Sequence, residues 1–140
     1  MKINRTAAAI LFTMLFIGCA ATARDQGGSR ELQTVSVSSF TCANPLIAQD
    51  VRNAIIGSLL DAYSVTTGEG AGVVIKGAII LAGDTSSDSN ISEIKATVLR
   101  GGKIMGAVTL TRAEAALSSD ASPEAMGKKI GTKIREILSR

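Results

Sequence analysis

The ten-residue run Val73 to Ala82 (VVIKGAIILA) limits the possible folds of this chain more than any other segment. Successive side chains of a β-strand point to opposite faces, and in this run both sets are largely apolar. One set is Val73, Ile75, Ile79 and Leu81, and the other is Val74, Lys76, Ala78, Ile80 and Ala82. A strand that is apolar on both faces is usually central in its sheet. The run therefore predicts a sheet with this segment in its middle.

Three further segments show the alternation of strands: Thr34 to Phe40, Ile91 to Arg100, and Lys103 to Arg112. Gly101 and Gly102 join the last two. A three-residue loop, Arg100-Gly101-Gly102, would pair Val98 with Ile104 and Ile94 with Val108. That register keeps one face of the hairpin apolar, so we expect three loop residues.

Two amphipathic helices are expected, and each begins with a polar cap followed by proline. Asn44-Pro45 begins the first, and Ser122-Pro123 begins the second. The apolar stripe of the first helix is Ile47, Val51, Ile55, Leu59 and Tyr63, and that of the second is Met126, Ile130, Ile134, Ile137 and Leu138. Gly127 and Gly131 of the second helix predict close packing against a sheet.

Glycines follow the first helix, from Gly68 to Gly72. Phosphate-binding loops run from a strand into a helix, whereas these residues run from a helix into a strand. They therefore predict a turn and no nucleotide site.

The order strand, helix, three strands, helix predicts an α+β fold, a two-layer sandwich. Its four-stranded mixed sheet would carry both helices on one face. A right-handed crossover would set the 73–82 strand parallel to the 34–40 strand. We expect residues 113–121 to form a linker.

The N-terminal residues have the pattern of an export signal. Lys2 and Arg5 precede an apolar run from Ala7 to Ile17, which is too short to span a membrane comfortably. The run ends in Phe16-Ile17-Gly18-Cys19, which resembles the lipobox of bacterial lipoproteins. That resemblance implies a diacylglycerol on Cys19, a signal peptide over 1–18, a tether over 19–31 and a single domain over 32–140. The alternative is an ordinary secretory signal cleaved near Ala21-Thr22-Ala23.

Composition narrows the possible functions. The net charge of +3 falls to +1 once Lys2 and Arg5 leave, because 13 cations then face 12 acids, so nothing indicates nucleic-acid binding. The chain has no His and no Trp. It therefore has no histidine-based catalysis or metal ligation. We expect no enzyme activity, no cofactor and no metal site.

Cys42 has no partner within the chain if Cys19 is acylated. We expect it to be a small buried apolar residue at the end of the first strand. The alternatives are an intermolecular or reactive thiol, or a disulfide with Cys19 if the lipobox interpretation is wrong.

Asp84 to Asn90 (DTSSDSN) loosely resembles a calcium-binding loop. Ser89 stands where such loops have glycine, and Lys95 stands where they have a bidentate glutamate. We therefore expect an ordinary hairpin loop.

Two surfaces are candidates for binding. Two helices with one apolar stripe each can cover only one face of the sheet, so the other face would expose Val74, Lys76, Ala78 and Ile80 beside Glu93, Lys95 and Thr97. An apolar centre with a charged rim is typical of partner-binding surfaces. The alternative is that the 113–117 linker covers this face. The second surface is the outer side of the last helix, where Lys128, Lys129, Lys133 and Arg135 could bind an anionic lipid or polymer.

The segment order behind a lipobox resembles small envelope lipoproteins. These are the periplasmic core of curli-secretion lipoproteins, activator lipoproteins of penicillin-binding proteins, and the lipopolysaccharide-transport lipoprotein of the outer membrane. The resemblance lies in TVSVSSF, NPLIAQDVRNAIIGSLLDAY, VVIKGAIIL and SPEAMGKKIGTKIREIL. It implies a non-catalytic binding or assembly factor for an envelope protein complex. Ala20 after Cys19 resembles the outer-membrane sorting pattern, which implies a lipid-anchored domain facing the periplasm.

Overall fold

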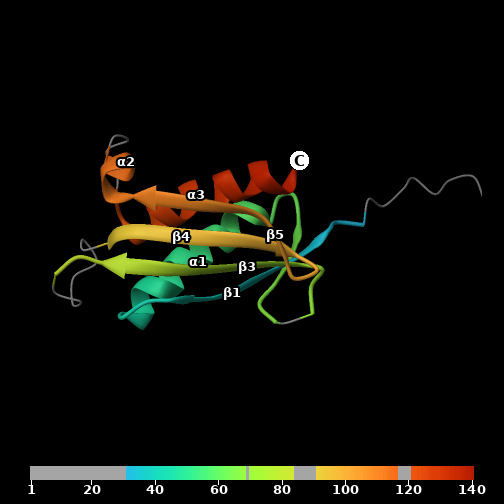
Figure 1. Ribbon diagram of the computed structural model, residues 1–140, viewed down its shortest axis with the longest axis horizontal. Coiled ribbons are helices and arrows are strands. Elements are labelled where there is room, and N and C mark those ends of the chain that lie inside the picture. The colour runs from blue at the N-terminus through green and yellow to red at the C-terminus, as the bar shows by residue number, and fades with distance from the viewer. Residues whose placement is uncertain (1–30, 69, 84–90, 117–120) are drawn as a thin grey trace, which may run out of the picture. The chain divides into compact units, whose positions relative to one another are not determined.

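The computed structural model describes residues 31–68, 70–83, 91–116 and 121–140 (Figure 1). The chain divides into two units, Met1–Glu31 and Leu32–Arg140. All described helices and strands belong to the second unit. In chain order they are β1 (Thr34–Thr41), α1 (Pro45–Leu59), β2 (Ser64–Thr66), β3 (Val73–Leu81), β4 (Ile91–Arg100), β5 (Lys103–Thr111), α2 (Arg112–Ala116) and α3 (Pro123–Leu138).

The sheet has five strands in the order β2-β1-β3-β4-β5. β1 pairs in parallel with β2 and β3, and β3, β4 and β5 pair antiparallel. The α+β class, the central position of the 73–81 strand and its parallel pairing with β1 are confirmed. The prediction of four strands is wrong, because the three residues of β2 add a short strand beside β1.

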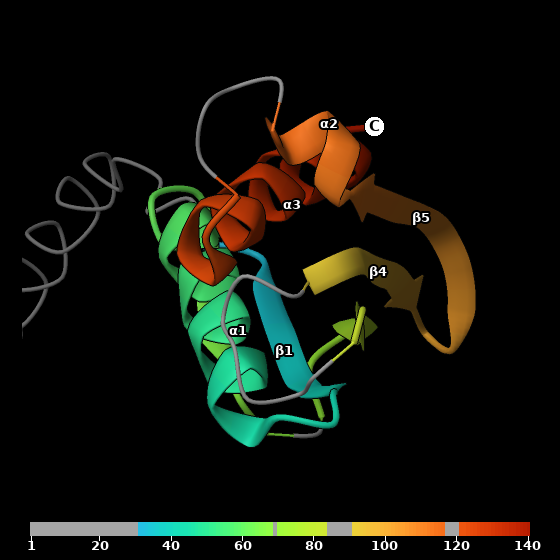
Figure 2. The ribbon, with the colours of Figure 1, turned by 90° about the vertical axis from the view of Figure 1, so that its left-hand side faces the viewer.

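The two long helices lie side by side against one face of the sheet (Figure 2). Their first turns begin as expected. The Asn44 side chain accepts a hydrogen bond from the Leu46 amide at 3.0 Å, and the Ser122 hydroxyl accepts one from the Ala125 amide at 3.2 Å. Both predicted helices are therefore confirmed, and each has its polar cap and a proline in the first turn. The first helix is shorter than expected, because α1 ends at Leu59 and Tyr63 of the predicted stripe lies beyond it.

The core lies between these helices and the sheet. It is built from aliphatic side chains of every long element, and the largest fully buried ones are Ile47, Ile55, Leu59, Ile75, Ile91, Ile94, Met126, Ile130 and Ile134. Burial of such side chains contributes about 1.5–3 kcal/mol each. The short helix α2 occupies part of the predicted linker, so the described residues form three helices where two were expected. Its Ala115 is fully buried in the same core.

The β4–β5 hairpin differs from its predicted register. Gly101 and Gly102 alone form the loop, with φ angles of 55° and 79°, and Arg100 pairs with Lys103. Two consecutive positive φ angles are typical of the tight turn that matches strand twist. A bulge then restores the apolar face, since Leu99 pairs with Ile104 but Val98 pairs with Gly106. The three-residue loop and the pairs Val98–Ile104 and Ile94–Val108 were therefore wrong predictions, although the hairpin still keeps one face buried.

Gly127 and Gly131 allow close packing of helix on helix, not of helix on sheet as expected. A Cβ atom on Gly127 would lie 2.7 Å from the Ala54 Cβ of α1. A Cβ atom on Gly131 would lie 2.5 Å from the Ser58 Cβ of α1. The two glycines therefore set how closely α3 approaches α1.

Candidate functional site

The sheet face opposite the helices is the first candidate site. On β3, Lys76 is exposed, Val74 and Ala78 are half-buried, and Ile80 is 43% exposed. Alternate residues of β3 are buried against the helices. All four predicted partner-binding residues therefore lie on the side of the sheet away from the core. We call this surface, on β3, β4 and β5, the open face.

Charged and apolar side chains of the neighbouring strands extend the open face. Lys95 pairs with Glu93 at 3.1 Å, and Lys95 stands opposite Ala78 in the sheet. At the other end, Val74 pairs with Leu99, which pairs with Ile104. These three apolar residues form one row across the sheet.

Ile104 is 72% exposed, so it is among the most exposed large apolar side chains of the described residues. The predicted three-residue loop would pair Ile104 with Val98 and so place it on the buried face. The Gly101-Gly102 pair was the signal that could have placed Ile104 opposite Leu99.

The alternative that the linker covers the open face does not hold for its described part. Lys129 of α3 donates from Nζ to the Ala115 carbonyl of α2 at 2.9 Å. Together with the burial of Ala115, this contact places α2 beside α3, on the helical side of the sheet (Figure 2). At the β1 edge, the Ser36 hydroxyl donates to the Gly68 carbonyl, and Ser36 is buried. The chain after β2 thus covers the sheet there, but not at Lys76 or Ile80.

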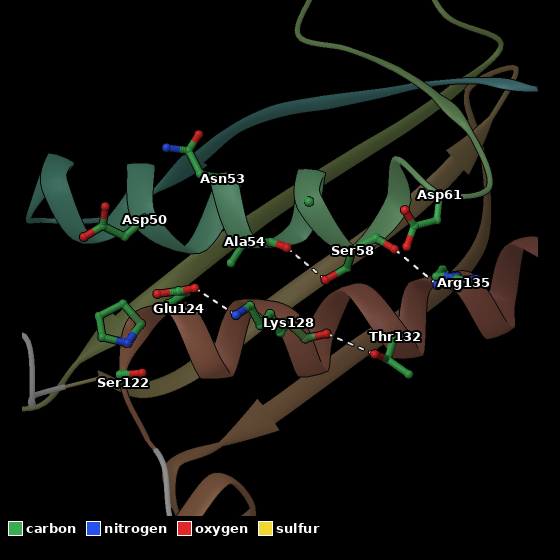
Figure 3. Close-up of a pocket in the computed structure, with 12 residues that line it drawn as sticks. Asp50, Asn53, Ala54, Ser58, Asp61, Ser122, Glu124, Lys128, Thr132 and Arg135 are labelled. Atoms are coloured by element: carbon green, nitrogen blue, oxygen red, sulfur yellow. Dashed lines mark hydrogen bonds and ion pairs between the residues drawn. The ribbon is translucent and has the colours of Figure 1, made fainter.

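A groove of about 890 Å³ runs along the seam between α1 and α3 (Figure 3). Small side chains form its floor because Gly127 and Gly131 bring the helices together. Charged side chains stand along it, and the lining residues are Asp50, Asn53, Ala54, Gly57, Ser58, Asp61, Ser122, Pro123, Glu124, Lys128, Thr132 and Arg135.

The polar groups of this groove bind one another. Lys128 pairs with Glu124 at 2.8 Å, and the Ser58 hydroxyl donates to the Ala54 carbonyl at 2.9 Å (Figure 3). Arg135 donates to the Ser58 carbonyl at 3.5 Å and so links α3 to α1. Two of these contacts lie within a single helix, and the Arg135–Ser58 hydrogen bond is the one among them that crosses from α3 to α1.

The four predicted anion-binding cations do not form one surface. Lys128 and Arg135 both line the α1–α3 groove. Lys129 contacts α2, and Lys133 lines a separate groove beside β5. The cations therefore divide between two flanks of α3. Residues seven positions apart share a flank, because seven residues make nearly two helical turns.

Glu114 of α2 binds Thr111, the last residue of β5. Its carboxylate accepts hydrogen bonds from the Thr111 amide at 2.8 Å and the Thr111 hydroxyl at 3.0 Å. These two hydrogen bonds are the main cause that lowers the pKa of Glu114 below its ordinary value of 4.5, and Lys133 lowers it further. The charged form of Glu114 is therefore the one that the fold favours.

Cys42 directly follows β1 and is half-buried, so the prediction of a buried residue is only partly right. It packs against the edge of the core and lines a hollow of about 310 Å³ with Phe40 and Arg52. Arg52 donates from Nε and Nη2 to the Val37 carbonyl, at 3.1 and 2.8 Å. That carbonyl lies where the pairing register of β1 with β3 shifts. Arg52 therefore donates to a backbone carbonyl at the irregular part of the β1–β3 pairing.

The predicted signal peptide over 1–18, the lipidated Cys19 with nearly all of the tether over 19–31, and the calcium-like loop Asp84 to Asn90 lie outside the described residues. Within the described ranges, no group of three or more acidic or cysteine side chains could hold a metal ion. The helices described here also include none that is long and apolar enough to cross a membrane.

The fold is similar to that of several solved bacterial proteins, although no protein-family model and no curated protein matches the sequence. A PelC dodecamer from Paraburkholderia phytofirmans is 12% identical, with a TM-score of 0.50, over 77% of this chain and 88% of that chain. A PelC variant from the same organism, also a dodecamer, is 13% identical, with a TM-score of 0.50, over 77% and 89%. The protein XCC0632 of the family DUF330, from Xanthomonas campestris, is 9% identical, with a TM-score of 0.54, over 77% and 86%.

At these identities the similarity shows the fold alone. The three families that the segment order resembles are not among these structures. Membership in any of them therefore stays a prediction.

Proposed function

We propose that this chain is a lipid-anchored, non-catalytic accessory factor of a bacterial envelope complex, and that its open face binds a partner protein. The anchor would be on Cys19, and the domain would face the periplasm from the outer membrane. The observation that carries the proposal is the exposure of Ile80 and Ile104 on a sheet face that takes no part in the core.

Exposed aliphatic side chains on such a face favour contact with a partner protein, because that contact removes their apolar surface from water. Lys76 and Lys95 lie between Ile80 and the apolar row that ends in Ile104, and Glu93 stands opposite Ile80. Apolar and charged positions are therefore mixed across the open face, as they are in many interfaces between proteins that also exist apart. The PelC structures are dodecamers, so the same fold does occur in a protein assembly.

The anionic-ligand alternative has less support. It needs Lys128, Lys129, Lys133 and Arg135 to act together, and these side chains lie on two flanks of α3. We therefore place the partner-binding surface on the sheet.

The test is recovery of crosslinked partners from envelopes that carry the tagged full chain. Ile80→Arg should abolish recovery of one specific complex, because the partner would have to bury a charged side chain in place of an apolar one, and removing that charge from water is costly even beside Glu93. Leu46→Arg is the matched control, since Leu46 is 70% exposed on α1 and lies off the open face. Both variants should unfold at the temperature of the unmodified chain.

Equal recovery with Ile80→Arg and with Leu46→Arg would refute the open face as the binding surface. The anchor is tested separately by the mass of the mature chain, which should begin at an acylated Cys19. A free thiol at Cys19 would refute the anchor without bearing on the open face.

A further inference from the structure

The outer strand β5 has one edge that no other described strand covers. It is nine residues long and pairs with β4 alone, whereas the opposite outer strand, β2, has three residues. Figure 2 shows β5 at the end of the sheet away from β1. The N–H and C=O groups along an uncovered edge can pair with a further extended chain.

A groove of about 350 Å³ lies between β5 and the last turns of α3. On the β5 side it runs from Met105 to Thr109, a length of roughly 17 Å for five extended residues. Ile137 of α3 provides an apolar wall close to the strand, because a Cβ atom on Gly106 would lie 2.9 Å from Ile137 Cδ1. We call this surface the β5 groove.

The charge of the β5 groove is mainly positive. Lys133 and Arg140 line it, with Glu136 as the one acid among its lining residues. Lys103 and Arg112 stand at the two ends of β5. An extended ligand lying along this edge would therefore pass a cation at each end and two along its length.

We propose that the outer edge of β5 binds an extended acidic segment of a partner protein by strand addition. Backbone hydrogen bonds to β5 would supply the pairing. Alternate side chains of an extended ligand point to opposite sides of the sheet. Its acidic side chains would therefore lie on the α3 side and meet Lys133 and Arg140 in the β5 groove. Its apolar side chains would lie on the other side, beside the exposed Ala107 of the open face.

A second copy of this chain fits the edge less well. Antiparallel pairing of two β5 strands centred on Ala107 would place Lys103 of each copy opposite Thr111 and next to Arg112 of the other. Parallel pairing would place Lys103 next to Lys103. Like charges at paired positions destabilise a sheet, so the charges favour an acidic partner.

The available edge ends before Thr111. The Thr111 amide already donates to the Glu114 carboxylate, so it cannot pair with a ligand. The pairing residues are therefore expected within 103–110. This surface is separate from Ile80, so its failure would leave the proposed function standing.

The test uses the full chain in detergent and a capped heptapeptide that alternates glutamate and valine. Binding should slow hydrogen exchange of backbone amides within 103–110 and leave those of residues 76–80 unchanged. The same heptapeptide with two adjacent central residues replaced by proline should not bind, because one of the two would have to donate its N–H to β5 and proline has none.

The charge requirement is tested with Lys133→Glu combined with Arg140→Glu. This pair should weaken binding by at least about tenfold and should favour a lysine–valine heptapeptide instead. The matched control is Lys128→Glu combined with Arg135→Glu, which makes the same charge change on the other flank of α3. Ile80→Arg should leave heptapeptide binding unchanged.

Three results would overturn the proposal. The first is no change in exchange within 103–110 on adding the heptapeptide. The second is an equal loss of affinity in both paired variants, which would indicate attraction by net charge alone. The third is a dimer of the chain that forms without peptide and is lost in the Lys133→Glu, Arg140→Glu variant.

Discussion

The close packing of α3 on α1 predicts opposite effects for alanine at two helical glycines. At Gly57, on the exposed side of α1, a new Cβ atom would have no neighbour within 4 Å. Gly57→Ala should therefore stabilise the fold by up to about 1 kcal/mol, which is the helix-propensity difference. At Gly131 of α3, a new Cβ atom would lie 2.5 Å from Ser58 Cβ and 2.8 Å from Ser58 Oγ.

The expected size of the Gly131 effect follows from two terms. Overpacking of this kind costs roughly 1–3 kcal/mol, and helix propensity returns about 1 kcal/mol. Gly131→Ala should therefore lower the free energy of unfolding by up to about 2 kcal/mol. The two alanine variants should differ by roughly 1–3 kcal/mol, or roughly 4–12 °C in Tm for a domain of this size.

A second substitution tests whether Ser58 causes the clash. In the Ser58→Gly background, the nearest remaining atom to the new Cβ is Ile55 Cα at 3.5 Å, an ordinary contact. Gly131→Ala should then be neutral or stabilising, and the double-mutant cycle should give a coupling of roughly 1–3 kcal/mol.

Urea unfolding followed by far-UV circular dichroism measures these differences, because the chain has no Trp and a single Tyr for fluorescence. The reasoning is refuted if Gly131→Ala stabilises the chain as much as Gly57→Ala does. It is also refuted if Ser58→Gly leaves the effect of Gly131→Ala unchanged.

Two further predictions concern capping and pH. Ser122→Ala should lower the free energy of unfolding by about 1 kcal/mol, measured by urea unfolding, because it removes the acceptor for the Ala125 amide; no loss would contradict the capping role. Glu114→Gln should be less stable than the unmodified chain near pH 7. Because the pKa of Glu114 is lowered on folding, its contribution is present above pH 4.5 and is lost as the pH falls through the lower folded value. Thermal unfolding of both chains across pH 3 to 7 tests this, and a difference that stays constant with pH would contradict it.

The long elements could be predicted because several signals agreed. Asn44-Pro45 and Ser122-Pro123 marked the helix starts, and the spacing of the aliphatic residues marked the buried sides. β2 and α2 could not, because three and five residues are too few to show a period. Their positions depend on tertiary contacts, such as the burial of Ala115 between α2 and the core.

The hairpin register shows where a correct physical criterion led to a wrong alignment. Keeping one face apolar was right, but a bulge can meet that requirement as well as a longer loop can. The bulge beside Val98 places Ile104 on the open face and Gly106 against Ile137 of α3. The residue of β5 that the bulge leaves unpaired is Met105. The apolar row that ends in Ile104 and the β5 groove both depend on it.

Some parts of the candidate sites could be predicted from the sequence and others could not. Ile80 and its neighbours on β3 follow from strand alternation alone, so their placement was accessible from sequence. The division of Lys128 and Arg135 from Lys129 and Lys133 also follows from helical periodicity, but treating them as one outer face obscured it. The α1–α3 groove needed the depth of helix contact at Gly127 and Gly131, which spacing alone does not give.

The two proposed surfaces have one physical origin. Each long helix has a single apolar stripe, so α1 and α3 both pack on the same side of the sheet and leave the other side open. The outer strand of the parallel part of the sheet is the short strand β2, whereas the outer strand of the antiparallel part is the long strand β5. The face and the edge that the described residues leave uncovered therefore meet at β5, where Ile104 lies on the face and Met105 lies at the edge. Some partners could bind both the face and the edge. For such a partner, the loss of binding free energy on changing Ile80 and Lys133 together should equal the sum of the losses from the two single changes, since residues on separate surfaces contribute independently.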